Sequence, residues 1–211
     1  HHIHDMGSER SFEDFQSIGV ESAVAMGGEG LAAMMGAMGV ENMASLGSES
    51  MFQIAEGMSG EHMMEMDSSS AFGMFDTMGS DQALNMGGDQ LAGMFAAMEG
   101  AHMAESMDGA FMADAAAMMS FEDLDGLGGD SAFGMFETMG ADKAMAMGGD
   151  QIAGMFSAMG SDQLSSIGSE GLVDAFANMG LDGVAAMGGE DLAEMFDVMG
   201  GSALGELDAA T

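Results

Sequence analysis

The chain has 211 residues, of which 36 are Asp or Glu and only two are basic, Arg10 and Lys143, so its formal net charge at pH 7 is −34. This balance excludes direct binding to nucleic acid or to an anionic membrane surface, because there is no basic patch to meet the phosphates. Pro, Cys, Trp and Tyr are absent, but 31 Met and 13 Phe supply material for a hydrophobic core. No apolar run approaches the ~18 residues of a membrane-spanning helix, which argues against membrane insertion.

Residues 1–6 carry three histidines, His1, His2 and His4, and precede the repetitive part of the chain. We interpret this segment as an N-terminal arm or the remnant of a tag, since it lacks the pattern of a secretory signal. Imidazole can bind transition metals, but an arm or tag is the simpler interpretation of these histidines.

Residues 7–207 repeat with a period of about 20 residues and are interpreted as a single repeat domain. The stretch MGGDQLAGMFAAM at Met86–Met98 recurs as MGGDQIAGMFSAM at Met147–Met159. A one-residue insertion lies near Phe121, and residues 208–211 form a C-terminal tail. The ten repeats, each numbered from position 1, start at Gly7, Gly27, Gly47, Asp67, Gly87, Met107, Gly128, Gly148, Gly168 and Gly188.

Each repeat has the pattern of two short helices. Apolar residues at positions 5 or 6, 8, 9 and 12 follow the spacing of one helical face and predict a first helix of about 10 residues. Positions 15–20 predict a second helix of about 6 residues, and the scarcity of period-2 alternation argues against strands. The predicted buried stripe comprises Leu91, Met94, Phe95 and Met98 in the fifth repeat, and Ile152, Met155, Phe156 and Met159 in the eighth.

Glycine and acidic residues mark the helix ends. Glycine at positions 1 and 13 follows the last apolar residue of a helix, where it can adopt a positive φ at the C′ position. Carboxylates at positions 3 and 15 fall in the first turn of each helix, where they cap free N–H groups and complement the helix dipole. These acids are Glu9, Glu29, Glu49, Asp89, Asp130, Asp150, Glu170 and Glu190 at position 3, and Glu21, Glu41, Glu61, Asp81, Asp142, Asp162 and Asp182 at position 15.

Isolated helices of this length are unstable in water, so the repeats must bury their apolar stripes against one another. We therefore predict an all-α fold, an α-solenoid of ten ~20-residue helix–turn–helix repeats. With neighbouring helices ~8–10 Å apart, such a stack would form a rod or superhelix about 90 Å long.

A 60-residue pattern is superimposed on the 20-residue repeat. Positions 5 and 6 alternate between a small residue with Phe, a large residue with Ala, and two larger residues, as at Ala71-Phe72, Leu91-Ala92 and Phe111-Met112. Duplication of a three-repeat block accounts for this pattern most simply, and a superhelix with about three repeats per turn is the alternative.

Methionine at position 12 forms a ladder that has two interpretations. Thioethers can bind Cu(I), but these residues fall on the predicted buried stripe, where a flexible side chain suits core packing. We favour the core, because a ladder spaced by about 9 Å does not bring several sulfurs together. The ladder comprises Met38, Met58, Met78, Met98, Met118, Met139, Met159, Met179 and Met199.

No catalytic, cofactor-binding or metal-binding residue is predicted. His62 and His102 both occupy position 16, but two repeats separate them by roughly 20 Å, so they cannot share an ion. No nucleophile–base arrangement or phosphate-binding loop is present. The turns that carry carboxylates permit weak Ca²⁺ binding at most, since no EF-hand loop occurs.

These observations favour a non-enzymatic structural repeat protein. The first repeat is polar, with Asp14 where Met or Ile is otherwise common, which suits a terminal cap, whereas the last repeat keeps its apolar stripe and is expected to stack on another molecule. We expect an extracellular or cell-surface fibre, surface-layer or adhesin component that self-associates or binds a protein partner. The alternatives are an acidic scaffold for a protein complex, an ice- or mineral-binding face formed by small residues at positions 7, 10 and 11 (Gly93, Ala96, Ala97; Gly154, Ser157, Ala158), and a metal reservoir.

Overall fold

The computed structural model describes the backbone of residues 2–98 and 100–210, and the side chains of residues 7–98, 100 and 102–200. Within these ranges every regular element is an α-helix and no strand occurs, which confirms the all-α prediction. The described helices also include none that is long and apolar enough to cross a membrane. The chain divides into two compact parts, His1–Met98 and Glu99–Thr211.

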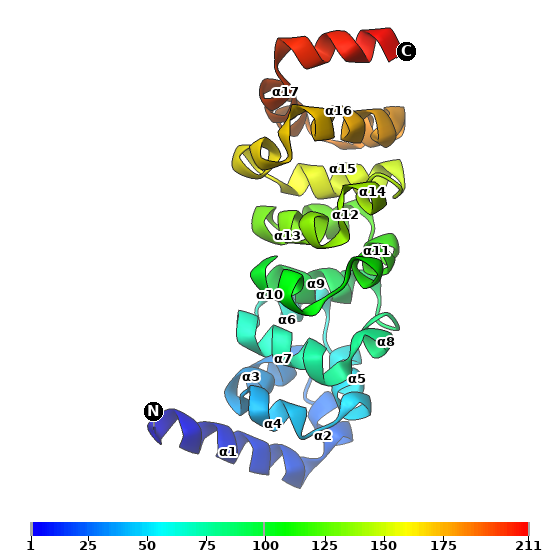
Figure 1. The fold of residues 1–211 in the computed structure, drawn as a ribbon. Coiled ribbons are helices and arrows are strands. Elements are labelled where there is room, and N and C mark those ends of the chain that lie inside the picture. Colours follow the sequence, from blue (N-terminus) through cyan, green and yellow to red (C-terminus); the bar gives the residue numbers. More distant parts are fainter. Residues whose placement is uncertain (1, 99, 211) are drawn as a thin grey trace. The chain divides into compact units, whose positions relative to one another are not determined.

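The N-terminal part alternates long and short helices, in the order that the repeat pattern predicts (Figure 1). Its first helix begins at His2, within the segment that we interpreted as an arm. The long helices are α1 (His2–Ile18), α3 (Gly28–Met38), α5 (Ser48–Glu56), α7 (Ser68–Met78) and α9 (Gly88–Met98), and the short ones are α2 (Val20–Val24), α4 (Val40–Ala44), α6 (Gly60–Met64) and α8 (Ser80–Ala83).

The C-terminal part continues the alternation. The backbone of α16 is non-helical at Gly168 and Gly180, so this element contains three helical segments in series. The backbone of α17 turns in the same way at Gly200, and its last segment extends into the predicted tail. The elements are α10 (Gly100–Ser106), α11 (Gly109–Met118), α12 (Phe121–Asp125), α13 (Gly129–Met139), α14 (Ala141–Ala144), α15 (Gly149–Ala158), α16 (Ser161–Ala186) and α17 (Gly189–Ala210).

Glycine joins consecutive helices, at most junctions with the positive φ that we predicted, although Gly148 and Gly160 have a negative φ. Gly39 ends α3 and begins α4 with φ 80° and ψ 153°. This is an extended region open essentially to glycine alone, rather than the left-handed helical region of a C′ cap. Ten of the described glycines have a positive φ, and at four junctions where glycine is replaced a side chain caps the helix instead. These N-caps are Ser59, Asp67, Asp108 and Ser120.

The predicted apolar stripes form the core. Phe95 is fully buried and meets Phe75 edge-on, with ring centroids 6.5 Å apart; Phe156 and Phe136 repeat this contact at 5.7 Å. Eight of the nine ladder methionines are buried, which confirms their core location. The prediction is wrong for Met118, which is 41% exposed while its neighbour Met119 is buried.

The register of α11 explains this error. Asp108 caps α11 through the backbone N–H of Phe111, so the cap lies at position 2 of this repeat, one residue later than the cap at position 1 of the second and fourth repeats. Its buried residues Met112, Ala115, Ala116 and Met119 then match the spacing of Leu91, Met94, Phe95 and Met98. Met107 precedes Asp108 as Met66 precedes Asp67, so the extra residue lies between Met103 and Met107 and not near Phe121.

Within each part, the short helix of one repeat packs on the long helix two repeats later. This pairing joins α4 to α7 and α6 to α9 in the N-terminal part, and α10 to α13 and α12 to α15 in the C-terminal part. Glycine at position 7 permits the contact, because a Cβ atom at Gly93 would lie 2.7 Å from the Cα and carbonyl carbon of Gly60. Close backbone approach of this kind leaves no room for a side chain.

The same contact overturns part of the predicted small-residue face. Gly93 and Gly154 at position 7 are buried between helices rather than exposed, and Ala96, Ala97, Ser157 and Ala158 at positions 10 and 11 are half-buried. Position 7 thus serves the packing of the helices and cannot belong to an exposed lattice.

Candidate functional site: the Gln151 contact and its pocket

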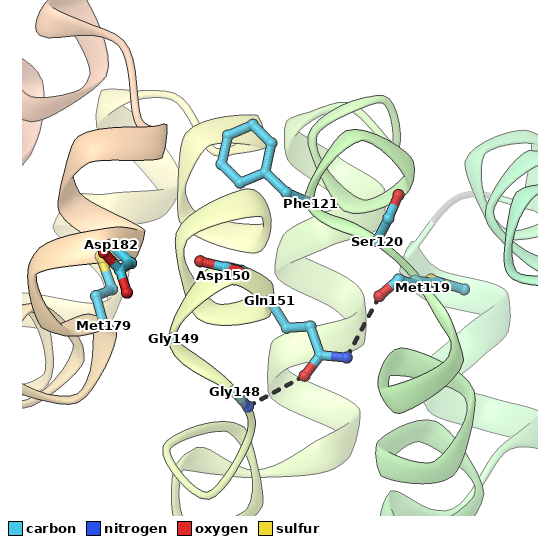
Figure 2. A pocket seen from close by; sticks show the side chains of 9 residues that line it. All are labelled: Met119, Ser120, Phe121, Gly148, Gly149, Asp150, Gln151, Met179 and Asp182. Atoms are coloured by element: carbon cyan, nitrogen blue, oxygen red, sulfur yellow. Dashed lines mark hydrogen bonds between the residues drawn. The ribbon is translucent and has the colours of Figure 1, made fainter.

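Gln151 connects two repeats in the C-terminal part through both ends of its side-chain amide. Its Oε1 accepts a hydrogen bond of 3.1 Å from the backbone N–H of Gly148, at the start of α15. Its Nε2 donates to the carbonyl of Ala117 at 3.0 Å and to that of Met119 at 3.3 Å, where α11 ends; Figure 2 shows the bond to Met119. One amide therefore satisfies the free N–H of one helix and the free carbonyls of another.

Gln90 makes the same connection in the N-terminal part. Its Oε1 accepts from the Gly87 N–H at 3.2 Å, and its Nε2 donates to the carbonyl of Met58 at 2.7 Å. Asp191 in the tenth repeat accepts from the Gly188 N–H and from the hydroxyl of Ser157. In each of these three repeats, the side chain at position 4 thus forms a hydrogen bond to the repeat two before it.

We expect Gln151→Glu to lower the free energy of unfolding by about 1–3 kcal/mol, because the carboxylate cannot donate to the carbonyls that the amide now satisfies. Gln53→Glu is the matched control, since Gln53 is exposed on α5 and its substitution should change stability by less than about 0.5 kcal/mol. Urea unfolding followed by circular dichroism measures both. Equal stability of the two variants would contradict the role assigned to Gln151.

An open pocket of about 500 Å³ lies beside Gln151 (Figure 2). Its carboxylates are Asp150, at position 3 of the eighth repeat, and Asp182, at position 15 of the ninth. The wall opposite Gly148 and Gly149 is formed by Met119, Ser120 and Phe121, from the junction of α11 and α12. No nucleophile hydrogen-bonded to a base is described among the lining residues.

A second hollow of about 530 Å³ occupies a related place in the N-terminal part. Ser48 at position 2 faces the junction of α7 and α8, which includes Met78 and Asp81. The Ser48 hydroxyl donates to the carbonyl of Met78, and Ser68 makes the equivalent bond to Met98 at 2.6 Å. A concavity with a position-15 carboxylate thus occurs in each part.

The acids lie in the first turns of their helices as predicted, except Glu9, which lies inside α1, and they do not all cap as predicted. Glu29 and Glu41 lie in the first turns of α3 and α4, yet these helices have no side-chain cap hydrogen bond. Their contribution is therefore limited to the interaction with the helix dipole, about 0.3–1 kcal/mol each.

The histidines do not form a site in the described part of the chain. The Nδ1 of His62 lies 2.8 Å from the hydroxyl of Ser59, and the two residues form a capping box at the start of α6. His1 and the side chains of His2 and His4 lie outside the described residues. Among those described, no group of three or more His, Asp or Glu is placed to hold a metal ion.

The glutamines are the residues that sequence reasoning missed. Gln90 and Gln151 occupy the same position of the two stretches that match most closely, which was the available signal. Their polarity suggested exposure, whereas both are half-buried.

A comparison with models of known protein families found no match, and a search of curated proteins found no significant match either.

Proposed function

We propose that the chain is a non-enzymatic structural protein whose ten repeats stack as one α-solenoid. The observation that carries this proposal is the recurrence of one contact at fixed repeat positions. Gln90 binds the end of α5 as Gln151 binds the end of α11, and in both cases the partner lies two repeats earlier. Polar groups at the ends of helices therefore form hydrogen bonds with side chains of another repeat, as is expected for stacked repeats.

The role that follows is architectural. We propose an extracellular or cell-surface fibre, surface-layer or adhesin component that assembles through the ends or sides of the stack. The charge of −34 supports a salt-rich setting, because carboxylates without basic partners repel one another unless ions screen them.

Assembly predicts that sedimentation velocity will show species larger than a monomer as protein concentration rises. The effect should be greater in high salt, where the repulsion between chains is screened. A chain that stays monomeric at every concentration and salt strength would contradict the assembly proposal.

A second candidate function is an acidic scaffold that binds a basic protein. The exposed acids at position 15, among them Asp81, Asp142, Asp162 and Asp182, favour it, since the chain has only two basic side chains of its own. Such binding should weaken steeply with ionic strength. Retention of a basic protein on the immobilised chain along a salt gradient distinguishes this function from assembly alone.

A further inference from the structure

The two glutamine contacts differ in the carboxylate beside them. In the N-terminal part, the Asp89 carboxylate accepts a hydrogen bond of 3.1 Å from the backbone N–H of Gly60. Asp150 holds the equivalent position in the C-terminal part but forms no hydrogen bond or ion pair with any described residue. The difference follows from one substitution, because Phe121 stands where Gly60 stands in the other contact.

Phe121 therefore keeps open a space that the N-terminal contact fills. Gly60 lies so close to the start of α9 that a Cβ atom there would meet Asp89. With a phenyl side chain at the equivalent position, Phe121, Asp150 and Asp182 instead line one pocket, while Gln151 is occupied by the contact between repeats (Figure 2). Asp182 likewise has no hydrogen-bond partner among the described residues.

We propose that this pocket binds the guanidinium group of an arginine side chain on a basic partner protein. The inference rests on the scaffold function proposed above and assigns it a site. A guanidinium is planar, so it can stack on the Phe121 ring and donate to carboxylates at its edges. Two carboxylates would leave most of the six to eight ligand positions of Ca²⁺ to water, so the pocket offers at most a weak calcium site.

Charge complementarity favours a foreign basic partner over a second copy of the chain. Each copy carries a charge of −34, and its only arginine, Arg10, is exposed among the acids Glu9, Glu13 and Asp14. Docking of Arg10 would bring these acids toward Asp150 and Asp182, and like charges placed together oppose binding.

The test uses the full chain and the tripeptide acetyl-Gly-Arg-Gly-amide, with citrulline in place of arginine as the neutral control. In ¹⁵N–¹H spectra, the arginine peptide should shift the amides of residues 148–151 and 182, and the citrulline peptide should not. The double variant D150N/D182N should bind about three- to tenfold more weakly, as expected for two exposed ion pairs. The matched control D114N/D142N removes two exposed carboxylates that do not line the pocket and should bind within about twofold of the wild type.

A third variant tests the origin of the pocket. F121G should remove the stacking surface and allow Asp150 to close on the backbone, so arginine-peptide binding should fall while the chain stays folded by circular dichroism. Equal weakening in D150N/D182N and D114N/D142N would assign the binding to the overall negative field and overturn the pocket. An absence of shifts at residues 148–151 would overturn it as well.

A binding experiment with poly-L-arginine distinguishes failure of the pocket proposal from failure of the scaffold function. If poly-L-arginine binds in a salt-dependent way while the tripeptide does not, the pocket is overturned and the scaffold proposal stands. If poly-L-arginine fails to bind at low salt, the scaffold proposal fails. Self-association that is lost in both R10Q and D150N/D182N would identify a second copy as the occupant and overturn the foreign partner.

Discussion

Phe95→Ala is expected to lower the free energy of unfolding by about 3–5 kcal/mol, because it removes a fully buried ring and leaves a cavity. The substitution also removes the edge-on contact between the rings of Phe95 and Phe75. A loss of this size is a large fraction of the 5–15 kcal/mol that stabilises an ordinary domain. Urea unfolding followed by circular dichroism measures it.

Met64→Ala is the control for this prediction. Met64 is 47% exposed on α6, so its truncation should change stability by no more than about 0.5 kcal/mol. Phe156→Ala should reproduce the Phe95 result in the C-terminal part, where Phe156 is 1% exposed. Similar small losses for all three variants would show that the apolar stripes do not form the core described above.

Gly93→Ala is expected to destabilise the chain by about 1–3 kcal/mol, the cost of forcing an extra carbon into a packed contact. The new Cβ would meet the backbone of Gly60, which cannot rotate away as a flexible side chain can. Alanine normally stabilises a helix relative to glycine by up to about 1 kcal/mol, so a destabilising effect here isolates the close approach of α6 and α9. Differential scanning calorimetry measures the change.

Gly36→Ala should have the opposite sign. Gly36 is exposed within α3, and the nearest atom to its added Cβ, a carboxylate oxygen of Asp67, would lie 3.8 Å away. The substitution should therefore stabilise the chain by about 0.4–1 kcal/mol. If both substitutions stabilise, α6 and α9 do not pack as closely as the structure places them.

The helices could be predicted from the sequence because a helical face is a local property. The spacing of Leu91, Met94, Phe95 and Met98 identifies a buried stripe without reference to the rest of the chain. Glycine at the junctions is likewise a local signal, and it predicts where the helices end. The order of long and short helices follows from these two signals alone.

The contacts between repeats could not be predicted in this way, since they depend on how helices cross. Gly93 resembled a small surface residue, because nothing local reveals that Gly60 approaches it from two repeats earlier. Gln151 and Asp150 are adjacent polar residues in one motif, yet the first joins two repeats and the second faces a pocket. Met118 was predicted to be buried because the 20-residue period was continued unchanged from Met98. The cap of α11 at Asp108 shifts the register by one residue, so Met119 is buried instead.

Pulsed electron paramagnetic resonance can measure whether equivalent repeats make the same contact two repeats apart. Because the chain lacks cysteine, spin labels can be attached at A44C/D76C in the N-terminal part and at A104C/E137C in the C-terminal part. All four positions are exposed and hold equivalent places in the pairs α4–α7 and α10–α13, although the second pair is one residue further apart in sequence. Both labelled pairs should give the same narrow distance distribution. Distributions with separate maxima, or a broad distribution for either pair, would contradict the shared contact.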